Sequence, residues 1–594
     1  MNTNYNNHFS NSLKTFFKSK FDLEINTFEF QNTRKEFKGN VTLLVFPILK
    51  YLKIDVEKLA KLIGEYLLKN NRNVEGFNVV KGFLNLSLSD TFFFDCFSAI
   101  YRDKNFGHKI LDKNSPKMMV EFSSPNTNKP LHLGHIRNNL LGYSISKILE
   151  ADGKKVIKTQ IINDRGIHIC KSMVAWIKYG KGDTPKKSGL KGDQLVGKYY
   201  VIFELEYKKQ IASLISKGKS IKEAEKTAPI ILEAQEMLRL WESKDSKVIS
   251  LWKKMNQWVY DGFDLTYKKL GVNFDSYYYE SKTYLVGKKI VEKGLKQGLF
   301  FKKNDGSVWI DLSDEGLGEK LLLRSDGTSV YITQDLGTAL LRMEKNPKLN
   351  GLVFTVGNEQ DYHFKVLFTI IKKLGFNWSS SLYHLSYGMV DLPSGKMKSR
   401  EGTVVDADNL IDEMTKKAKS IAKSVGKIET LKNSERKNLY NIIGLGALKY
   451  FILKVDPKKR ILFDPEASID FNGNTGPFIQ YTYARIKSLV KNTKDQFLSN
   501  KTSFNLDERE RKLITHLNLY PVTISQAAEL YSPAIIANYL YELVKNYNTF
   551  YQNLKVHGAK EPYQKEFRIA LSKRVGYVIE NASSLLGINL PETM

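Results

Sequence analysis

Two histidines three residues apart, His132 and His135, have the clearest potential for chemistry in this chain. They follow a short apolar segment, 118–122, which predicts a buried strand, and they precede apolar residues at helical spacing. A helix start carries unpaired N–H groups and a partial positive charge, so it attracts phosphate. Gly134 has no side chain and lets a flat ligand approach the backbone. Together with Lys129, the pair suits a triphosphate whose charge must be balanced during transfer.

Three further groups of polar residues could complete such a site. Tyr331 and Asp335 are four apart and share one face if a helix begins there. Gln360 follows an apolar strand-like run at 352–357, and a basic loop lies between Gly395 and Gly402. Such a loop can close over phosphates. Each group also has a plain alternative. The histidines, or Tyr331 with Asp335, could be an ordinary helix start with a polar cap. Gln360 could lie in a polar loop, and the basic loop could be a solvated turn.

The elements around the histidines predict a parallel sheet. Residues 155–162 read as the next strand after the helix, so the order is strand, helix, strand, and the two strands run parallel. In such sheets ligands bind at the carboxyl ends of the strands. The histidine segment and Asn163-Asp164 both lie at such ends. Residues 176–280, rich in Lys and Glu with helical periodicity, predict a helical insertion without an assigned role.

Composition bounds the class of protein. A chain of 594 residues is too long for one core and predicts three to five domains. There is no apolar run of about 18 residues and no secretory signal at the start, so we expect no membrane span. Two isolated cysteines, Cys96 and Cys170, fit a reducing cytosol. The net charge of +28 favours a polyanionic partner such as nucleic acid, although the lysine bias of proteins from an AT-rich genome would give the same excess.

The two ends of the chain differ in character. Residues 54–67 predict an amphipathic helix and 79–86 a strand, with no catalytic cluster nearby. From 411 onwards the pattern is helical, with aromatic residues interleaved with Asn, Gln and Lys. That mixture suits stacking on unpaired RNA bases, although most such aromatics could equally form helix core.

Two motifs in this order resemble the signatures of class I aminoacyl-tRNA synthetases: His132-Leu133-Gly134-His135 and Lys396-Met397-Lys398-Ser399-Arg400. Further blocks narrow the resemblance to arginyl-tRNA synthetases. These are the Glu121–Asn126 lead-in, Asn163–Gly166, Tyr331–Asp335, Asn474–Tyr481, Ser532-Pro533 and an N-terminal Gly-Phe-Leu-Asn at 82–85. The resemblance covers nearly the whole chain. It implies an α/β plus all-α protein: a Rossmann-type parallel-sheet catalytic domain with helical insertions, an N-terminal α+β accessory domain and a C-terminal helical anticodon-binding domain.

The resemblance also implies domain bounds and a reaction. The expected bounds are 1–112 for the accessory domain, 113–410 for the catalytic domain, 411–455 for a helical stem and 456–594 for the anticodon-binding domain. Arginine and Mg²⁺-bound ATP would give arginyl-adenylate and pyrophosphate. The arginyl group would then pass to the terminal adenosine of tRNA(Arg). We expect no tightly bound cofactor or resident metal, no membrane contact, a cytoplasmic location and a monomer.

Site residues follow position by position from the resemblance. The catalytic set is Lys129, His132, His135 and Lys396, and ATP contacts add Asn126, Gly134 and Met397. The arginine pocket would comprise Glu121, Asn126, Tyr331, Asp335 and Gln360. Expected tRNA contacts are Phe83, Asn85, Gln480, Tyr481, Arg485, Tyr539 and Tyr547. A guanidinium presents five donors in a planar fork and wants carboxylate and amide oxygens, which agrees with the pocket.

One departure from the class pattern concerns a lysine. The general signature has a second lysine where Ser399 stands here, and in this family a lysine before the histidines, here Lys129, is thought to replace it. Lys398 stands where the class has a small residue, and we have no physical account of it.

Three alternatives stay open at this point. An enzyme of the same class for lysine or glutamine is disfavoured by Tyr331, Asp335 and Gln360. An RNA-binding relative without catalysis is disfavoured by the intact histidines and lysines. A nucleotidyltransferase acting on a small acid without RNA leaves the large helical C-terminal third without a role.

Overall fold

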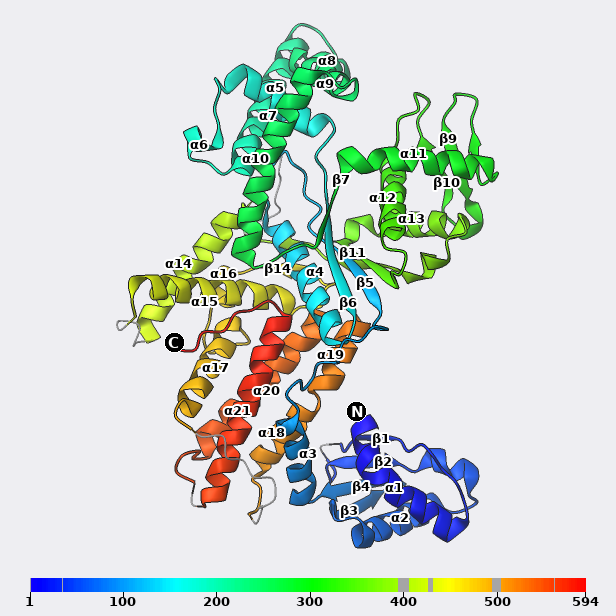
Figure 1. Cartoon of the computed structure of the whole chain (residues 1–594), viewed down its shortest axis with the longest axis vertical. Helices are drawn as coiled ribbons and strands as arrows, with labels where there is room; N and C mark the ends of the chain where they lie inside the picture. The colour runs from blue at the N-terminus through cyan, green and yellow to red at the C-terminus, as the bar shows by residue number, and fades with distance from the viewer. Residues whose placement is uncertain (1, 35, 394–404, 426–430, 494–503, 560) are drawn as a thin grey trace.

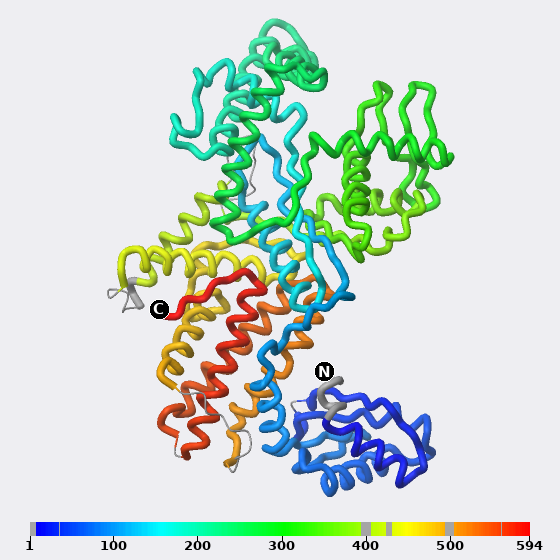
Figure 2. The backbone as a smooth tube through the Cα atoms, viewed as in Figure 1, coloured from blue at the N-terminus to red at the C-terminus, as the bar shows by residue number. Residues whose placement is uncertain are grey.

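The computed structural model describes residues 2–34, 36–393, 405–425, 431–493, 504–559 and 561–594. The central parallel sheet lies between two helical masses (Figures 1 and 2). The insertion after β6, in cyan and green, forms one end. The C-terminal helices, in orange and red, and the blue N-terminal domain form the other. No helix within these ranges combines the length and apolar character needed to cross a membrane.

The N-terminal domain is an antiparallel sheet, in the order β1-β2-β4-β3, packed against two helices. Its elements are α1 (Asn2–Phe21), β1 (Phe30–Asn32), β2 (Val41–Leu44), η1 (Phe46–Tyr51), α2 (Val56–Asn70), β3 (Val74–Val80) and β4 (Phe83–Leu88). The predicted single strand at 79–86 is therefore wrong, because a tight turn at Lys81 and Gly82 splits it into two paired strands. Both turn residues have positive φ, +49° and +78°, as a two-residue hairpin of type I′ requires.

The central domain has a five-stranded, fully parallel sheet in the order β12-β11-β5-β6-β7, which confirms the predicted sheet type. Its strands are β5 (Lys117–Glu121), β6 (Lys155–Ile162), β7 (Ser276–Tyr279), β11 (Gly351–Gly357) and β12 (Leu382–Tyr387). The helices that cover it are α4 (Leu133–Ala151), α11 (Glu280–Lys296), α12 (Tyr331–Lys345) and α13 (Asp361–Lys373), with η3 (Asn358–Gln360) and η4 (Asn377–Ser381) between elements.

Two insertions leave this sheet. The first is helical and comprises α5 (Ile167–Tyr179), α6 (Pro185–Ser188), α7 (Gly192–Ser216), α8 (Ile221–Thr227), α9 (Pro229–Glu242) and α10 (Ser246–Leu270). It ends before the predicted bound at 280, because residues 276–279 form β7 of the main sheet. The second carries an antiparallel sheet of β8 (Phe300–Lys302), β9 (Val308–Leu312) and β10 (Gly318–Leu323), with η2 (Ser313–Glu315).

The C-terminal third is helical, as predicted. Its elements are α14 (Ala407–Val425), α15 (Asn433–Leu453), α16 (Pro465–Ser468), α17 (Gly476–Val490), α18 (Glu508–Asn518), α19 (Tyr520–Glu529), α20 (Pro533–Asn553) and α21 (Pro562–Leu585). The predicted boundary at 410 falls inside α14. Helix α3 (Asp90–Arg102), from the N-terminal segment, packs on α18 and α21 through Phe94, whose ring lies 5.3 Å from Phe504 and 5.4 Å from Phe567.

Helix α4 lies at the centre of the molecule and is buried along most of its length. Its Arg137, 1% exposed, donates to three backbone carbonyls in two segments, 389–391 and 457–462, which carry the paired strands β13 (Val390–Asp391) and β14 (Ile461–Leu462). We call these two segments the connector. The distances are 3.0 Å to Met389, 2.9 Å to Pro457 and 2.7 Å to Lys459. A buried guanidinium with this set of acceptors fixes the first turns of α4 against the connector.

We predict that Arg137→Met lowers stability by about 3 kcal/mol, because three buried carbonyls lose a charged donor. Scanning calorimetry should show a thermal midpoint several degrees below that of the wild type. The matched control is Arg460→Met, since Arg460 pairs with Asp391 of the same connector but is largely exposed. It should change the midpoint little, and equal small shifts in both variants would contradict the role of Arg137.

Candidate functional site

The start of α4 is shaped by its two histidines. His132 is the N-cap residue, and its Nδ1 accepts a hydrogen bond from the Gly134 N–H at 3.2 Å. The Nδ1 of His135 accepts from the His132 N–H at 3.1 Å, and the ring centroids lie 3.9 Å apart. A Cβ on Gly134 would lie only 3.0 Å from the His132 ring, which explains the glycine between them.

Both imidazoles are neutral at physiological pH. Burial, together with the charge of Lys129, lowers the pKa of His132 to about 3. Burial, with the neighbouring His132 and Lys129, also lowers the pKa of His135 well below its usual range. Because each Nδ1 accepts a backbone N–H, the proton of each neutral ring lies on Nε2. The helix start therefore offers two N–H donors to an anion.

The turn after β5 is held under strain. Ser123 and Ser124 have positive φ, +83° and +38°, which are costly for residues with side chains. The Ser123 N–H donates to Asn138 of α4 at 2.5 Å, and its hydroxyl contacts the Tyr267 hydroxyl of α10 at 2.7 Å. Asn126 is exposed and forms a parallel bridge with Asn163, so the ends of β5 and β6 meet there. Lys129 follows, half-buried, before the histidines.

The opposite wall comes from α12 and the segment after β11. Tyr331 opens α12 and is 76% exposed, so its ring is available to a ligand. Asp335, one turn on, contacts His363 Nε2 at 2.6 Å. Gln360 is exposed at the end of η3, directly after β11. The contact between Asp335 and His363 thus brings the start of α12, with Tyr331, to the segment after β11 that carries Gln360. Contact of these residues with arginine stays a prediction.

Glu121 does not fit its predicted contact with a ligand. Its side chain is buried and forms an ion pair with Arg342 of α12. Arg342 is itself fully buried, with its guanidinium carbon 4.9 Å from the centre of the Tyr278 ring. The protein's own guanidinium thus occupies this carboxylate. Glu121 is placed to hold α12 against β5.

A carboxylate that the sequence analysis missed is Glu280, the first residue of α11 after β7. Burial raises its pKa to about 7; Arg165 opposes this shift, while Asp164 and Asp335 add to it. Asp164 fixes the start of α11 by accepting from Ser281 N–H at 2.8 Å and Ser281 Oγ at 2.7 Å. A signal was available: a carboxylate after a strand-like Tyr-rich run, at the same sheet edge as Asp164.

Lys396 and Met397, together with Lys398, Ser399 and Arg400, lie outside the described residues. The chain that follows them is described from Val405. Within the described ranges, no three His, Cys, Asp or Glu side chains are grouped closely enough to hold a metal ion.

The predicted tRNA contacts divide by burial. Asn85, Gln480, Tyr539 and Tyr547 are each at most 8% exposed, so direct contact with RNA does not fit their positions. Asn85 accepts from Thr42 at 2.5 Å, and Gln480 donates to two backbone carbonyls, those of Ile442 and Asn589, both at 2.9 Å. Asn85 Oδ1 and Gln480 Nε2 are thus bonded inside the protein, whereas Asn85 Nδ2 and Gln480 Oε1 are buried without a hydrogen-bond partner among the described residues. Phe83 is half-buried in β4, with its ring 5.6 Å from Phe46.

Tyr481 and Arg485 remain accessible. They line a hollow between α17 and α20, and the Arg485 guanidinium lies over the rings of Tyr481 and Tyr551, at 4.8 and 5.3 Å. The remaining lining is Phe471, Asn472, Phe478, Lys545, Asn548, Thr549 and Gln552. Aromatic faces beside a guanidinium and amides suit an unpaired base.

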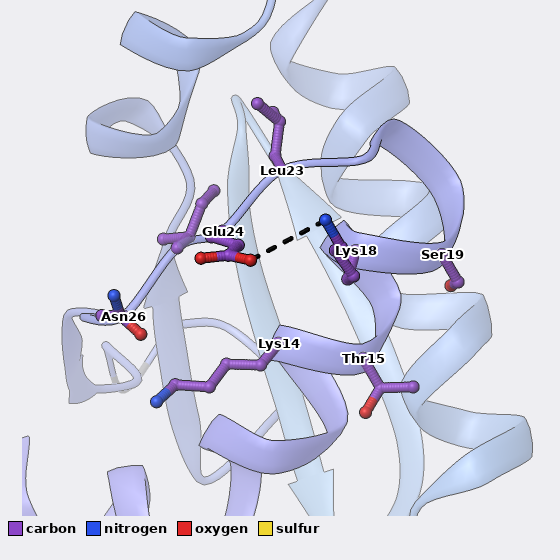
Figure 3. A pocket seen from close by; sticks show the side chains of 8 residues that line it. Lys14, Thr15, Lys18, Ser19, Leu23, Glu24 and Asn26 are labelled. Carbon is purple, nitrogen blue, oxygen red and sulfur yellow. Dashed lines mark ion pairs between the residues drawn. The ribbon is translucent and has the colours of Figure 1, made fainter.

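A second hollow lies on the N-terminal domain, between α1 and the segment after it (Figure 3). Lys18 there is already paired with Asp22 at 2.7 Å and Glu24 at 3.7 Å. We assign it no role.

Known proteins resemble this chain along its whole length. The family described as "tRNA synthetases class I (R), catalytic domain" matches residues 97–464, and "DALR anticodon binding domain" matches 479–594. An arginine–tRNA ligase of Flavobacterium psychrophilum is 57% identical over 593 residues, 98% of each chain. That of Amoebophilus asiaticus is 53% identical over 590 residues, again 98% of each chain.

Solved structures show the same fold. Thermus thermophilus arginyl-tRNA synthetase superposes with a TM-score of 0.77 at 22% identity, covering 98% of this chain and 99% of that one. The arginyl-tRNA synthetase of Plasmodium falciparum gives 0.73 at 21% identity, covering 100% and 99%. With the class I catalytic domain, the helical C-terminal domain and full-length relatives in agreement, the chain belongs to the arginyl-tRNA synthetases.

Proposed function

We propose that this chain joins arginine to tRNA(Arg) at the edge of the parallel sheet described above. Arginine and ATP give arginyl-adenylate and pyrophosphate, and the arginyl group then passes to the terminal adenosine of the tRNA. The observation that carries the proposal is the pairing of two unlike walls. One offers N–H donors at a helix start, and the other offers carboxylates to a guanidinium.

The α4 wall receives the triphosphate. In the first step an oxygen of the arginine carboxylate attacks the α-phosphorus, and pyrophosphate leaves. The Nε2–H groups of His132 and His135 stabilise the charge that grows on the leaving oxygens without a change in their own protonation. Lys129 adds a full positive charge beside them, Gly134 leaves room for the nucleotide, and Asn126 lies between the two substrates. Mg²⁺ enters with ATP as part of the substrate.

The opposite wall receives arginine. Asp335 and Glu280 supply carboxylates for the guanidinium fork, and the exposed Tyr331 and Gln360 complete the polar surroundings. Burial, with the like charges of Asp164 and Asp335, raises the cost of ionising Glu280, and a bound guanidinium lowers that cost. An analogue without the guanidinium would leave these groups unpaired, which supports discrimination without an editing domain.

We also propose roles for the parts outside the two walls. Lys396 and Met397 contact ATP from the second signature, and Lys129 supplies the charge that Ser399 lacks. The hollow beside Tyr481 and Arg485 takes an unpaired tRNA base, while Phe83 contacts tRNA from the accessory domain. The chain works as a monomer in the cytoplasm, where its two buried, unpaired thiols, Cys96 and Cys170, would stay reduced.

ATP–pyrophosphate exchange with each standard amino acid, with and without tRNA(Arg), tests the reaction. Exchange should proceed with arginine and should be strongest when tRNA is present. Exchange with lysine or glutamine in place of arginine would refute the proposal.

The pH dependence of arginine binding tests Glu280. Because its pKa is raised to about 7 in the empty protein, the carboxyl is protonated below that pH and must lose a proton to bind a guanidinium. The KM for arginine should therefore fall as pH rises from 6 to 8. Glu280→Gln should raise KM by about 10- to 100-fold and remove the pH dependence.

The matched control is Glu292→Gln, an exposed carboxylate about 18 Å farther along the same helix. It should keep both the KM and its pH dependence. If Glu280→Gln retains the wild-type pH profile, Glu280 is not the titrating group.

Replacement of Lys129 tests the missing charge. Lys129→Ala should slow adenylate formation by about 100-fold, because the developing pyrophosphate loses a cation, while tRNA binding persists. Exchange rates and a filter-binding assay measure the two properties. Lys155→Ala, an exposed lysine at the other end of the neighbouring β6, is the control and should behave as wild type. Normal turnover by Lys129→Ala would rule out the idea that Lys129 replaces the lysine missing at Ser399.

A further inference from the structure

The helical insertion, without a role in the sequence analysis, lies directly against the lead-in to the histidine pair. Gly197 of α7 is so close to this segment that a Cβ there would lie 2.8 Å from Pro130 Cδ and 3.5 Å from Lys129 Cα. The backbone of α7 thus sets the position of the backbone at Lys129.

The same lead-in is paired with the chain that enters α14. Leu133 N–H donates to the Val405 carbonyl at 3.2 Å, and Ala407 N–H donates to the Leu131 carbonyl at 2.9 Å. His132 and Asp406 form an antiparallel bridge between these bonds. Residues 405–407 therefore fix the backbone that carries the first histidine.

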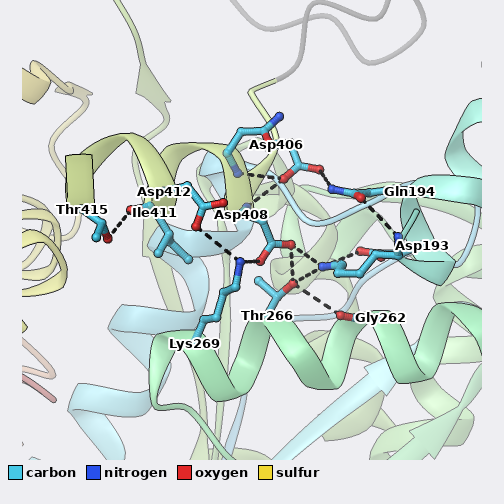
Figure 4. A network of polar contacts seen from close by, with 12 residues as sticks. Asp193, Gln194, Gly262, Thr266, Lys269, Asp406, Asp408, Ile411, Asp412 and Thr415 are labelled. Carbon is cyan, nitrogen blue, oxygen red and sulfur yellow. Dashed lines mark hydrogen bonds and ion pairs between the residues drawn. The ribbon is translucent and has the colours of Figure 1, made fainter. Parts of the chain in front are cut away.

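A polar cluster joins this pairing to the insertion (Figure 4). We call Lys191, Gln194, Thr266, Asp406 and Asp408 the anchor cluster. Lys191 of α7 forms an ion pair with Asp408 and donates to Thr266 Oγ1 of α10 at 2.5 Å, and Thr266 donates to Asp408 at 3.0 Å. Gln194 Nε2 donates to Asp406 Oδ2 at 3.3 Å. Asp406 Oδ1 accepts the Asp408 N–H at 2.8 Å and so caps α14.

The two insertion helices cannot shift against each other beneath this cluster. A Cβ on Gly192 of α7 would lie 1.8 Å from the Trp258 carbonyl of α10, and one on Gly262 would lie 2.3 Å from Asp193 Oδ1. The helices therefore meet with their backbones in close contact. A second lysine from α10, Lys269, reaches Asp408 Oδ1 at 3.1 Å but is 42% exposed.

Energetics favour a role in geometry over one in stability alone. The side chains of Lys191 and Asp408 are only 14% and 7% exposed, so both charges have lost most of their hydration. Apolar residues of similar volume often stabilise a fold as well as a buried ion pair does. What an ion pair with fixed hydrogen bonds adds is a defined position for its two elements, here α7 and the start of α14.

We propose that Lys191 and Gln194 of the insertion are positioning residues for the triphosphate side of the site, acting through Asp408 and Asp406. They hold residues 405–407 in register with 131–133 and so place the His132 ring and Lys129 against the triphosphate. The proposal rests on the function proposed above. An error of about 1 Å in such placement can cost about 100-fold in rate.

Steady-state pyrophosphate exchange and thermal unfolding of the full-length variants test this. Lys191→Met should reduce the kcat of exchange by about 10- to 100-fold and raise the KM for ATP, with the KM for arginine unchanged. Gln194→Met breaks the contact with Asp406 and the capping contact in which Gln194 Oε1 accepts the Lys191 N–H at 3.4 Å. Its loss of rate should be smaller than that of Lys191→Met but in the same parameters. It also keeps the test available if Lys191→Met does not fold.

Two lysines serve as controls. Lys198→Met removes an exposed lysine of the same helix and should leave both parameters unchanged. Lys269→Met removes the other lysine that pairs with Asp408 and leaves the residues of α7 unchanged. It should leave kcat near the wild-type value if position matters, whereas a loss equal to that of Lys191→Met would mean that only the neutralisation of Asp408 matters.

The outcomes separate the two proposals. Absence of arginine-dependent exchange in the wild type would defeat the proposed function. Wild-type activity with unchanged kcat and ATP KM in folded Lys191→Met and Gln194→Met would overturn only this inference, even if their thermal midpoints fall. A rise in the KM for arginine equal to that for ATP would also overturn it, because the effect would not be confined to one wall.

Discussion

The three hydrogen bonds from Arg137 to the connector are the constraint on which the site depends. They fix α4 in the middle of the molecule, with its start at the carboxyl edge of the sheet. Asn138, the next residue, donates to the Thr355 carbonyl of β11 at 2.7 Å and accepts from Ser123 after β5. Two adjacent residues thus connect the helix to the connector and to two strand ends. These contacts therefore determine the position of His132 and His135 at the start of α4.

The two walls solve opposite electrostatic problems. In the proposed function the α4 wall accepts a polyanion with neutral imidazoles, a helix start and one lysine. Protonated histidines so close together would repel each other, which is part of why their pKa values are lowered. The proposed arginine wall accepts a cation and brings Glu280 near Asp164 and Asp335; burial raises the pKa of Glu280, and the charges of these two residues add to the shift. A positively charged group beside Glu280 opposes this shift, as Arg165 does in part.

Local patterns in the sequence predicted the parts of the site that lie next to their own strand. The β5–α4 turn, the start of α12 and the end of β11 are each a single continuous stretch of chain, so motifs and periodicity could predict them. Glu280 was missed because β7 pairs with β6 across more than a hundred intervening residues, so the Tyr-rich run before Glu280 points to the site only when it is read as a further strand of the same sheet. The expected tRNA contacts of Asn85 and Gln480 illustrate a different limit. Residue type suggests a polar contact but does not show whether the partner is a ligand or the protein itself, here the Thr42 hydroxyl and two backbone carbonyls.

The position of the insertion between β6 and β7 has a mechanical consequence. Its last helix, α10, contacts both walls along one face. Trp252 donates to the Asp164 carbonyl at 2.6 Å, and Tyr260 donates to the Asp164 carboxylate at 3.1 Å, on the arginine side. Thr266, about 21 Å beyond Trp252 along the helix, reaches Asp408 on the ATP side. Because a helix is stiff over this length, a displacement at one wall is carried to the other. The insertion therefore does not interrupt the catalytic fold; its last helix connects the two walls that we propose hold arginine and ATP.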